Sequence, residues 1–261
     1  MHYFRVTIAY KGTHYFGWQA QSKDTLKEEY PTIEGTILKA LKKMSNYQHC
    51  TISAASRTDG GVHAQGQLAK ISLSIDISAD HLLLGLNSAL PLDIRILECA
   101  SSTKNFQPNV SSVSKEYHYY FTASKTDNVA ISEISLRLST HDDGPIDMAL
   151  LRTACQLFVG RHDFYNFSVR DLNNASSVRQ ISYCDILQAN FSPLVDEVYY
   201  LKIIGDGFLK YMIRYVMGAL IELGKGRITL EDIAFYLQHQ QDDKLSAKAK
   251  AKGLHLIKIN E

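Results

Sequence analysis

Residues 4–10, Phe-Arg-Val-Thr-Ile-Ala-Tyr, alternate between larger apolar side chains and smaller or polar ones. The larger side chains are Phe4, Val6, Ile8 and Tyr10. A period of two residues is typical of a strand that buries one face, because successive side chains of an extended chain point to opposite sides. The stretch therefore predicts an opening strand that packs one face against a core.

The segments after this strand indicate a first half built in the order β-α-β-β-α-β. Apolar residues recur twice at helical spacing, and the runs between them alternate as strands do. This order is that of a ferredoxin-like unit. After the opening strand, the predicted elements are a helix at 32–44, strands at about 49–55 and 67–76, a helix from the capping residue Ser78 to just before Pro91, and a strand at 94–97.

The rest of the chain indicates a second half of the same kind, separated from the first by the polar stretch 99–114. A polar surface excursion is expected at 124–144, and a turn at Ser192-Pro193. The predicted elements of this half are a Tyr-rich strand at 115–123, a helix at about 147–159, strands at about 178–190 and 196–204, a helix at 208–223, a short helix from Thr229 and a strand at 254–259.

Together these patterns predict an α+β fold with two tandem ferredoxin-like halves, residues 1–108 and 109–261. We expect the halves to form one extended, mainly antiparallel sheet with helices on one face and a central cleft where they meet. Because this arrangement is compatible with many activities, the fold alone indicates no function.

The composition is that of an ordinary globular protein with nearly balanced charge. The 261 residues include 28 Lys or Arg and 27 Asp or Glu, so the formal net charge is +1. This excludes a disordered chain and disfavours a strongly basic nucleic-acid binder, so any polyanionic partner must be held by local patches. Each of the two candidate patches is equally compatible with an ordinary solvated surface. The patches are Lys39, Lys42 and Lys43, and Lys244, Lys248, Lys250 and Lys252.

No motif indicates a metal, a cofactor or a membrane. The four cysteines are scattered, without a C-x-x-C pair or histidines at zinc-binding spacing. We expect them to be reduced, although the residues leave their pairing open. There is no nucleotide-binding glycine motif, no feature of a signal peptide, and no apolar run near the roughly 18 residues that span a bilayer. The sequence thus predicts a soluble, cytoplasmic protein with no cofactor and no metal.

The strongest indication of chemistry is the segment Ala54-Ala55-Ser56-Arg57-Thr58-Asp59-Gly60-Gly61-Val62-His63-Ala64. The predicted connection from Ser56 to Gln65 joins two neighbouring strands, yet it is longer than the roughly 2–5 residues of a tight hairpin. A long loop with one carboxylate beside an arginine and two glycines is a common place for a functional group. From the residues alone, an ordinary Asp-Gly turn with a surface arginine is the simpler interpretation.

Motifs along the whole chain favour a functional loop. The loop reads R-T-D-G-G-V-H-A from Arg57 to Ala64 and continues with Gly66-Gln67. The other motifs are Tyr10-Lys11-Gly12, Tyr15-Phe16-Gly17-Trp18-Gln19, Asn87 with Leu90-Pro91 and Asp93-Ile94, Lys115 with Tyr117 and Tyr119, Gly160 with His162-Asp163-Phe164 and Phe167, Phe208-Leu209 with Met212-Ile213-Arg214 and Gly218, and Ala251 to Leu256. In this order, from about residue 3 to 259, they resemble the motifs of the tRNA pseudouridine synthase A family.

The resemblance implies an isomerase that converts uridine to pseudouridine in tRNA, typically at positions 38, 39 and 40 of the anticodon stem-loop. It implies that Asp59 is the catalytic carboxylate and that Arg214 is the cation that keeps it ionised. For Arg214, the helical wheel alone favours a rim residue that snorkels to solvent. The resemblance further implies that Tyr117 stacks on the flipped base and that Arg57 positions RNA or shapes the loop. Members of the family need no cofactor and are usually homodimers whose tRNA spans both chains.

Two places depart from the family pattern. Residues 106–112 read Phe-Gln-Pro-Asn-Val-Ser-Ser where the family usually has F-H-A-R-F-S-A, and Ser56 replaces a usual Gly. These changes bear on how RNA is gripped and on which uridines are modified. A second hypothesis is therefore a catalytically weak tRNA-binding or tRNA-folding protein on the same scaffold. A third, RNA binding by tandem RRM-like units, requires an aromatic strand signature that the sequence lacks.

Overall fold

The computed structural model describes residues 1–19, 31–124, 126, 128–138, 146–169, 176–190 and 197–261. Its contacts divide the chain into two compact units, residues 1–113 with 255–261, and residues 114–254. The division therefore falls at 113 instead of 108, and the last strand groups with the first unit, whereas the sequence placed it in the second half. Pairing explains this grouping, because His255 and Leu256 lie parallel to His63 and Ala64.

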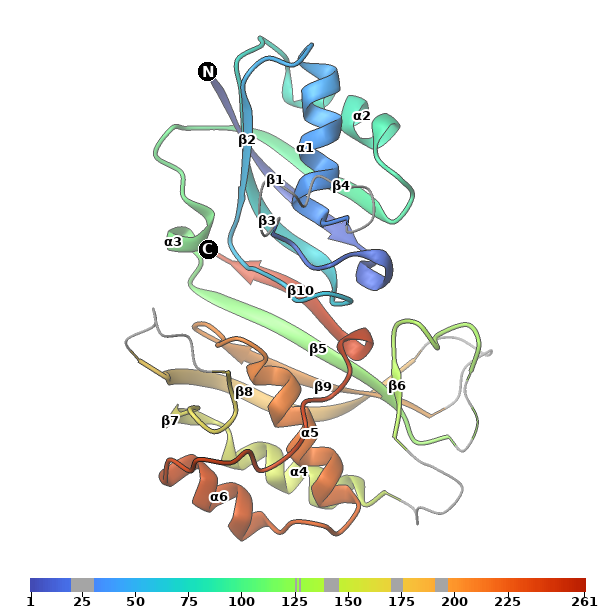
Figure 1. Ribbon diagram of the computed structural model, residues 1–261, viewed down its shortest axis with the longest axis vertical. Coiled ribbons are helices and arrows are strands. Elements are labelled where there is room, and N and C mark those ends of the chain that lie inside the picture. Colours follow the sequence, from blue (N-terminus) through green and yellow to red (C-terminus); the bar gives the residue numbers. More distant parts are fainter. Residues whose placement is uncertain (20–30, 125, 127, 139–145, 170–175, 191–196) are drawn as a thin grey trace. The chain divides into compact units, whose positions relative to one another are not determined.

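The first unit has the predicted β-α-β-β-α-β order (Figure 1). Its elements are β1 (His2–Tyr10), the short 3-10 helix η1 (Gly12–His14), α1 (Ile33–Met44), β2 (Cys50–Ala54), β3 (His63–Leu73), α2 (Ala79–Ala89), β4 (Ile94–Ser102), α3 (Pro108–Ser111) and the last strand β10 (Leu254–Asn260). β1 lies between β4 and β3, β2 pairs with β3, and these three pairings are antiparallel, as in a ferredoxin-like unit. α1 packs on β2, and α2 packs on β4.

Local sequence explains where these elements begin and what they bury. β1 buries the predicted face, Phe4, Val6, Ile8 and Tyr10. α1 begins after Thr32, whose hydroxyl accepts a hydrogen bond from the backbone N–H of Gly35 at 3.1 Å. α2 begins after Ser78 in the same way, with the N–H of His81 as the donor at 3.3 Å. Each hydroxyl satisfies one of the backbone donors that the start of a helix leaves unpaired.

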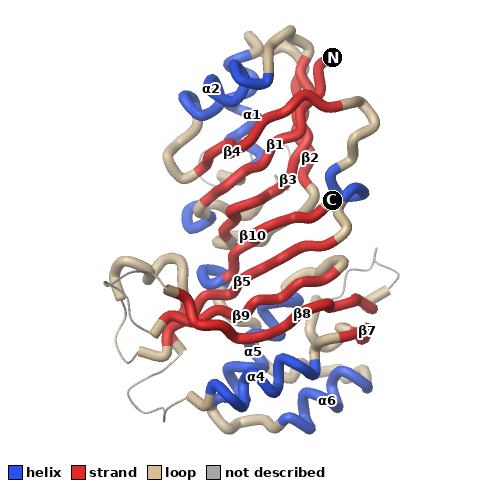
Figure 2. The backbone as a smooth tube through the Cα atoms, turned by 180° about the vertical axis from the view of Figure 1, so that it is seen from behind, coloured by secondary structure: helices blue, strands red, loops and turns tan. Residues whose placement is uncertain are grey.

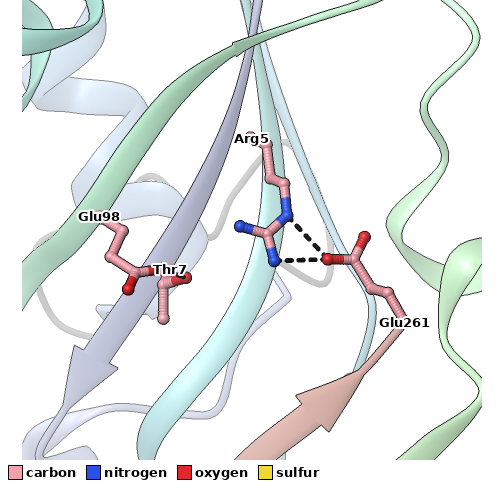
Figure 3. A network of polar contacts seen from close by, with 4 residues as sticks. All are labelled: Arg5, Thr7, Glu98 and Glu261. Carbon is pink, nitrogen blue, oxygen red and sulfur yellow. Dashed lines mark hydrogen bonds and ion pairs between the residues drawn. The ribbon is translucent and has the colours of Figure 1, made fainter.

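The other face of β1 carries polar side chains that link it to neighbouring segments (Figure 3). Arg5 Nε donates to Glu261 Oε2 at 2.7 Å, and Thr7 Oγ1 donates to Glu98 Oε2 at 3.0 Å. The first contact ties the C-terminal residue to β1 within the first unit. Exposed ion pairs contribute at most about 1 kcal/mol, so burial of the opposite face is what holds this strand.

The second unit also contains a mainly antiparallel sheet, with its helices α4, α5 and α6 packed together (Figure 2). Its elements are β5 (Ser114–Thr122), β6 (Leu136–Arg137), α4 (Met148–Leu157), β7 (Gly160–Asp163), β8 (Val178–Ala189), β9 (Val198–Gly205), α5 (Met212–Gly224), α6 (Leu230–Gln238) and the 3-10 helix η3 (Ala251–Gly253). The strand order is β5-β9-β8-β7, and β6 lies parallel to β5. β6 and β7 are additions to the predicted set. Residues 125, 127 and 139–144 of the predicted excursion lie outside the described residues, as does the predicted turn at Ser192-Pro193.

Three local differences from the predicted elements bear on the site. β3 begins at His63, so the connection after β2 spans residues 55–62 and is shorter than predicted. α5 begins at Met212 and not at residue 208, because Tyr211 adopts a left-handed backbone conformation with φ 64°. The predicted linker contains the short helix α3, which starts at Pro108, where the sequence predicts a boundary.

The structure confirms the α+β class and the predominance of antiparallel strands. All four cysteines are free thiols; Cys155 and Cys184 are buried, whereas Cys50 and Cys99 are partly exposed. In the described ranges, no helix has both the length and the apolar character needed to cross a bilayer.

Candidate active site

In the connection between β2 and β3, residues 55–62, the side chains from Ser56 to Asp59 alternate between buried and more exposed positions. Ser56 and Thr58 are buried, whereas Arg57 is exposed and Asp59 is partly buried. The loop therefore presents a guanidinium and a carboxylate next to two residues that are held in the interior. Asp59 is therefore a partly exposed carboxylate in a loop whose residues Ser56 and Thr58 are buried.

Buried polar contacts hold Ser56 and Thr58, the two buried polar residues of the loop. Gln67 on β3 is 0% exposed, and its amide accepts from the N–H of Ser56 at 3.2 Å and donates to the carbonyl of Ser56 at 2.6 Å. The hydroxyls of Tyr10 and Thr58 are hydrogen-bonded at 2.7 Å. An unpaired buried polar group costs about 1–3 kcal/mol, so these contacts strongly favour one conformation of the loop.

The segment that follows β1 lies against the same loop. The N–H of Trp18 donates to the carbonyl of Thr58 at 3.0 Å, and the N–H of Gly61 donates to the carbonyl of Tyr15 at 3.1 Å. Gly17 has φ 95°, and a Cβ built at this position would lie 2.7 Å from the carbonyl oxygen of Thr58. Only glycine fits both requirements. The motif at 15–18 therefore supports the loop that carries Asp59.

His63, at the end of the loop, takes part in local contacts. Its Nδ1 accepts from the N–H of Gly12 at 3.2 Å, and its ring stacks on that of His255 with centroids 4.5 Å apart. Among the described residues, no group of three or more His, Cys, Asp or Glu is placed to hold a metal ion.

Tyr117 lies on β5 with Tyr119 and Phe121 on the same face of the strand. Tyr119 and Phe121 are 0% exposed and are core residues. Tyr117 is 6% exposed, and its ring meets that of Phe208 nearly edge-on, with centroids 5.2 Å apart. The aromatic neighbour fixes the plane of the Tyr117 ring.

Arg214 lies in the first turn of α5 and is only 9% exposed. It is therefore more buried than a rim residue whose charged end snorkels to solvent. Its Nε donates to the carbonyl of Ala249 at 2.8 Å, and the N–H of Ala249 donates back to the carbonyl of Arg214 at 2.9 Å. The hydroxyl of Tyr119 donates to the next carbonyl, that of Lys250, at 2.6 Å. Arg214 and Tyr119 therefore hold the same stretch of chain, and a cation is kept in a largely buried position.

Three lysines gather over aromatic rings beside Arg214, and we call Lys210, Lys244 and Lys248 with Tyr165 and Tyr211 the basic-aromatic surface. Lys248 Nζ lies 3.9 Å and Lys210 Nζ 5.3 Å from the ring centroid of Tyr211. Lys244 Nζ lies 5.4 Å from that of Tyr165, and partial burial lowers the pKa of this lysine. Within the described part of the chain, none of the three lysines pairs with a carboxylate. The three lysines therefore give this surface a positive charge that no neighbouring carboxylate neutralises, and each is attracted to the face of a tyrosine ring.

The predicted site residues are distributed over both units. Asp59 and Arg57 belong to the first unit, and Tyr117 and Arg214 belong to the second. Of the predicted C-terminal basic patch, Lys244 and Lys248 join the basic-aromatic surface, whereas Lys252 donates to the carbonyl of Ser132 at 2.7 Å. The sequence did not predict that cations lie over the ring of Tyr211. It also did not predict that Gln67 supports the loop.

Comparison with known proteins gives one consistent result. The model of the family described as tRNA pseudouridine synthase matches residues 6–107 and 154–260. This match contains Arg57, Asp59 and Arg214, and Tyr117 lies in the interval between its two parts. A relative from Desulfotalea psychrophila named tRNA pseudouridine synthase A 2 is 70% identical over 259 residues, covering 99% of this chain and 98% of its own. Relatives named tRNA pseudouridine synthase A, from Thermodesulfovibrio yellowstonii and Moorella thermoacetica, are 34% and 32% identical, with 98% of each chain covered in both comparisons.

Proposed function

Because the chain belongs to the tRNA pseudouridine synthase family, we propose that Asp59 is the nucleophile with which it isomerises uridines 38, 39 and 40 of the anticodon stem-loop. The general activity follows from the family: this chain is an enzyme that converts uridine to pseudouridine in tRNA. The bond between N1 and C1′ breaks and one between C5 and C1′ forms, while C5 loses a proton and N1 gains one. Substrate and product are isomers, so the reaction consumes no oxidant, reductant or second substrate.

The observation that supports Asp59 is its presentation from a loop whose neighbouring residues are buried and hydrogen-bonded. A carboxylate can attack the ribose or the base to give a covalent intermediate, or it can assist deprotonation of the sugar. In each of these routes the carboxylate must be ionised and held at the reacting atoms.

We propose supporting roles for Arg214, Tyr117 and Arg57. A site that excludes water raises the pKa of a carboxylate, and the buried guanidinium of Arg214 opposes that rise. Extrusion of the target base costs a few kcal/mol, which stacking on Tyr117 offsets in part. Arg57 is exposed beside Asp59, where a guanidinium suits a contact with a phosphate.

The basic-aromatic surface is proposed to bind the tRNA backbone. Replacement of Lys210, Lys244 and Lys248 by Gln is expected to weaken tRNA binding and to reduce the slope of log K against log salt by about 0.7–0.9 for each phosphate that is no longer neutralised. The rate constant of the bound tRNA should stay close to that of the wild type. The measurement is tRNA binding over a series of salt concentrations.

The matched control replaces Lys39, Lys42 and Lys43 of α1, which removes the same charge from another surface. We expect this variant to retain the wild-type salt slope. Equal changes of slope in the two triple variants would show that only the overall charge matters, and would contradict a specific role of the basic-aromatic surface.

The decisive test of the proposed positions uses unmodified tRNA transcripts and maps pseudouridine after incubation with the enzyme. We expect modification at 38, 39 and 40 where a uridine is present, and none in transcripts that carry cytidine there. Modification at other positions would contradict the proposed target. Tight binding with no pseudouridine at all would favour the second hypothesis, a tRNA-binding protein with weak activity.

We also propose that the enzyme works in the cytoplasm as a homodimer, as the resemblance to the family implies. Sedimentation equilibrium tests the second part, because a homodimer has twice the mass of the chain at every concentration above its dissociation constant. A mass equal to that of one chain throughout would contradict it.

A further inference from the structure

We propose that Gln67 is a positioning residue for catalysis, which fixes the backbone that carries Asp59 through hydrogen bonds to Ser56 and Tyr10. The inference rests on the proposed role of Asp59. Gln67 is not itself a catalytic residue, because it is 0% exposed and no RNA atom can reach it. Any effect of Gln67 on the reaction must therefore pass through the loop.

The side-chain amide of Gln67 matches the backbone of Ser56 in a way that few side chains can. Its Oε1 accepts from the N–H of Ser56 at 3.2 Å, and its Nε2 donates to the carbonyl of the same residue at 2.6 Å. The Asn and Gln amides carry an acceptor and a donor on the same carbon, whereas an ionised carboxylate carries two acceptors and no donor. Two bonds to one residue fix both the position and the orientation of its backbone.

A second chain of contacts leads from Gln67 to the residue next to Asp59. Gln67 Nε2 donates to the hydroxyl oxygen of Tyr10 at 3.4 Å, and this hydroxyl is bonded to Thr58 Oγ1 at 2.7 Å. One buried amide thus reaches Ser56 directly and Thr58 through a tyrosine. The exposed Arg57 and the partly buried Asp59 follow these two fixed residues in the chain.

Loss of this support is expected to affect the chemical step more than the binding of tRNA. A displacement of about 1 Å at the reacting group can cost about 100-fold in rate. The lysines that we propose bind phosphates, Lys210, Lys244 and Lys248, belong to the second unit and not to this loop. The signature of a positioning residue is therefore a lower rate constant at an unchanged tRNA Kd.

The first unit offers a matched control in Asn87. Its Nδ2 donates to the carbonyl of Ile96 at 2.8 Å, and its Oδ1 accepts from the N–H of Ile96 at 2.9 Å. This is the same two-bond arrangement of an amide with one backbone residue, but it joins α2 to β4 and not to the Asp59 loop. Gln67→Glu and Asn87→Asp each replace a donor by a second acceptor in an otherwise similar side chain.

The experiment compares these two variants in single-turnover reactions, with tRNA binding and thermal unfolding measured alongside. At a temperature well below both unfolding midpoints, and at a pH at which the introduced carboxyl is ionised, we expect Gln67→Glu to lower the rate constant by about 100-fold at an unchanged tRNA Kd. Asn87→Asp should lose stability but keep the wild-type rate constant. Protonation of the introduced carboxyl returns a donor, so the rate of Gln67→Glu relative to wild type should rise as the pH falls. Gln67→Leu, which cannot regain a donor, should show no such rise.

If Gln67→Glu does not fold, Tyr10→Phe tests the proposal instead, because it removes the hydroxyl that joins Gln67 to Thr58 and leaves both hydrogen bonds between Gln67 and Ser56 in place. We then expect a smaller loss of rate, again at an unchanged tRNA Kd. The positioning role would be overturned if the rate constant of Gln67→Glu equalled that of Asn87→Asp. The same holds for Tyr10→Phe where it is used in place of Gln67→Glu. Either result would leave the assignment of Asp59 intact. Full activity of Asp59→Ala would instead overturn the assignment of Asp59 as the nucleophile, whatever the Gln67 and Tyr10 variants show.

Discussion

Asp59→Ala is expected to lower the single-turnover rate of pseudouridine formation by at least about 10⁴-fold, because losses of this size follow removal of a nucleophile that acts with other groups. Binding of tRNA should persist, since the change removes a negative charge from a protein that binds a polyanion. Alanine is preferred to asparagine as the replacement, because an asparagine here would precede Gly60, and Asn-Gly sequences deamidate and regenerate aspartate.

Asp80→Ala provides the control, because Asp80 is an exposed carboxylate in the first turn of α2 in the same unit. It removes the same charge and should cost only a few tenths of a kcal/mol in stability, with the rate retained. Pseudouridine mapped after single turnover, together with tRNA binding for both variants, provides the measurement. An Asp59→Ala rate equal to that of Asp80→Ala would remove Asp59 from the chemical step.

The order of elements could be predicted because it depends on local patterns. Alternation identifies β1, since Phe4, Val6, Ile8 and Tyr10 are the residues that it buries. The hydroxyl cap Ser78 places the start of α2 to within a residue, because the cap acts on the backbone of the same turn. These signals lie within a few residues of the structure that they determine.

The support of the loop could not be predicted because its partners are distant in the sequence. Gly66-Gln67 extends the loop motif, but no local pattern shows that the side chain of Gln67 contacts Ser56, which lies eleven residues away in the loop. The predicted start of α5 was wrong for a related reason. Phe208 and Leu209 continue the apolar pattern of the helix, so the pattern places its start too early. The left-handed conformation of Tyr211 is rare for a residue other than glycine, and no local sequence signal predicts it. The sheet pairing of residues 255 and 256 with 63 and 64 likewise depends on tertiary structure.

The proposed catalytic residues were found by motif and not by physical pattern. From the residues alone, Asp59-Gly60 reads as a turn and Arg214 as a rim residue. The structure shows why such patterns mislead: Arg214 belongs to a strongly apolar helix, yet it is kept in the interior by the carbonyl of Ala249. A buried charge with an identified partner is a stronger indication of function than its place in a periodic pattern.

Arg214→Met is expected to lower the rate constant by about 10³-fold, because it removes the buried cation that we propose stabilises the ionised carboxylate, while it keeps most of the side-chain volume. It also leaves the carbonyl of Ala249 without its donor, which should cost about 1–3 kcal/mol of stability. Arg214→Lys keeps the charge but not the planar guanidinium, so we expect a rate between those of wild type and Arg214→Met.

Tyr119→Phe distinguishes the effect of the Arg214 charge from the effect of holding the chain at Ala249 and Lys250. This variant removes the hydrogen bond to the carbonyl of Lys250, and so loosens the same stretch of chain without removing a cation. We expect it to lose stability but to keep the rate constant. The pH profile adds a second criterion: a guanidinium lowers the pKa of a carboxylate, so its removal should move the acidic limb of the rate profile to higher pH. If Tyr119→Phe reduced the rate as much as Arg214→Met, and neither profile moved, Arg214 would act by holding the chain and not by its charge.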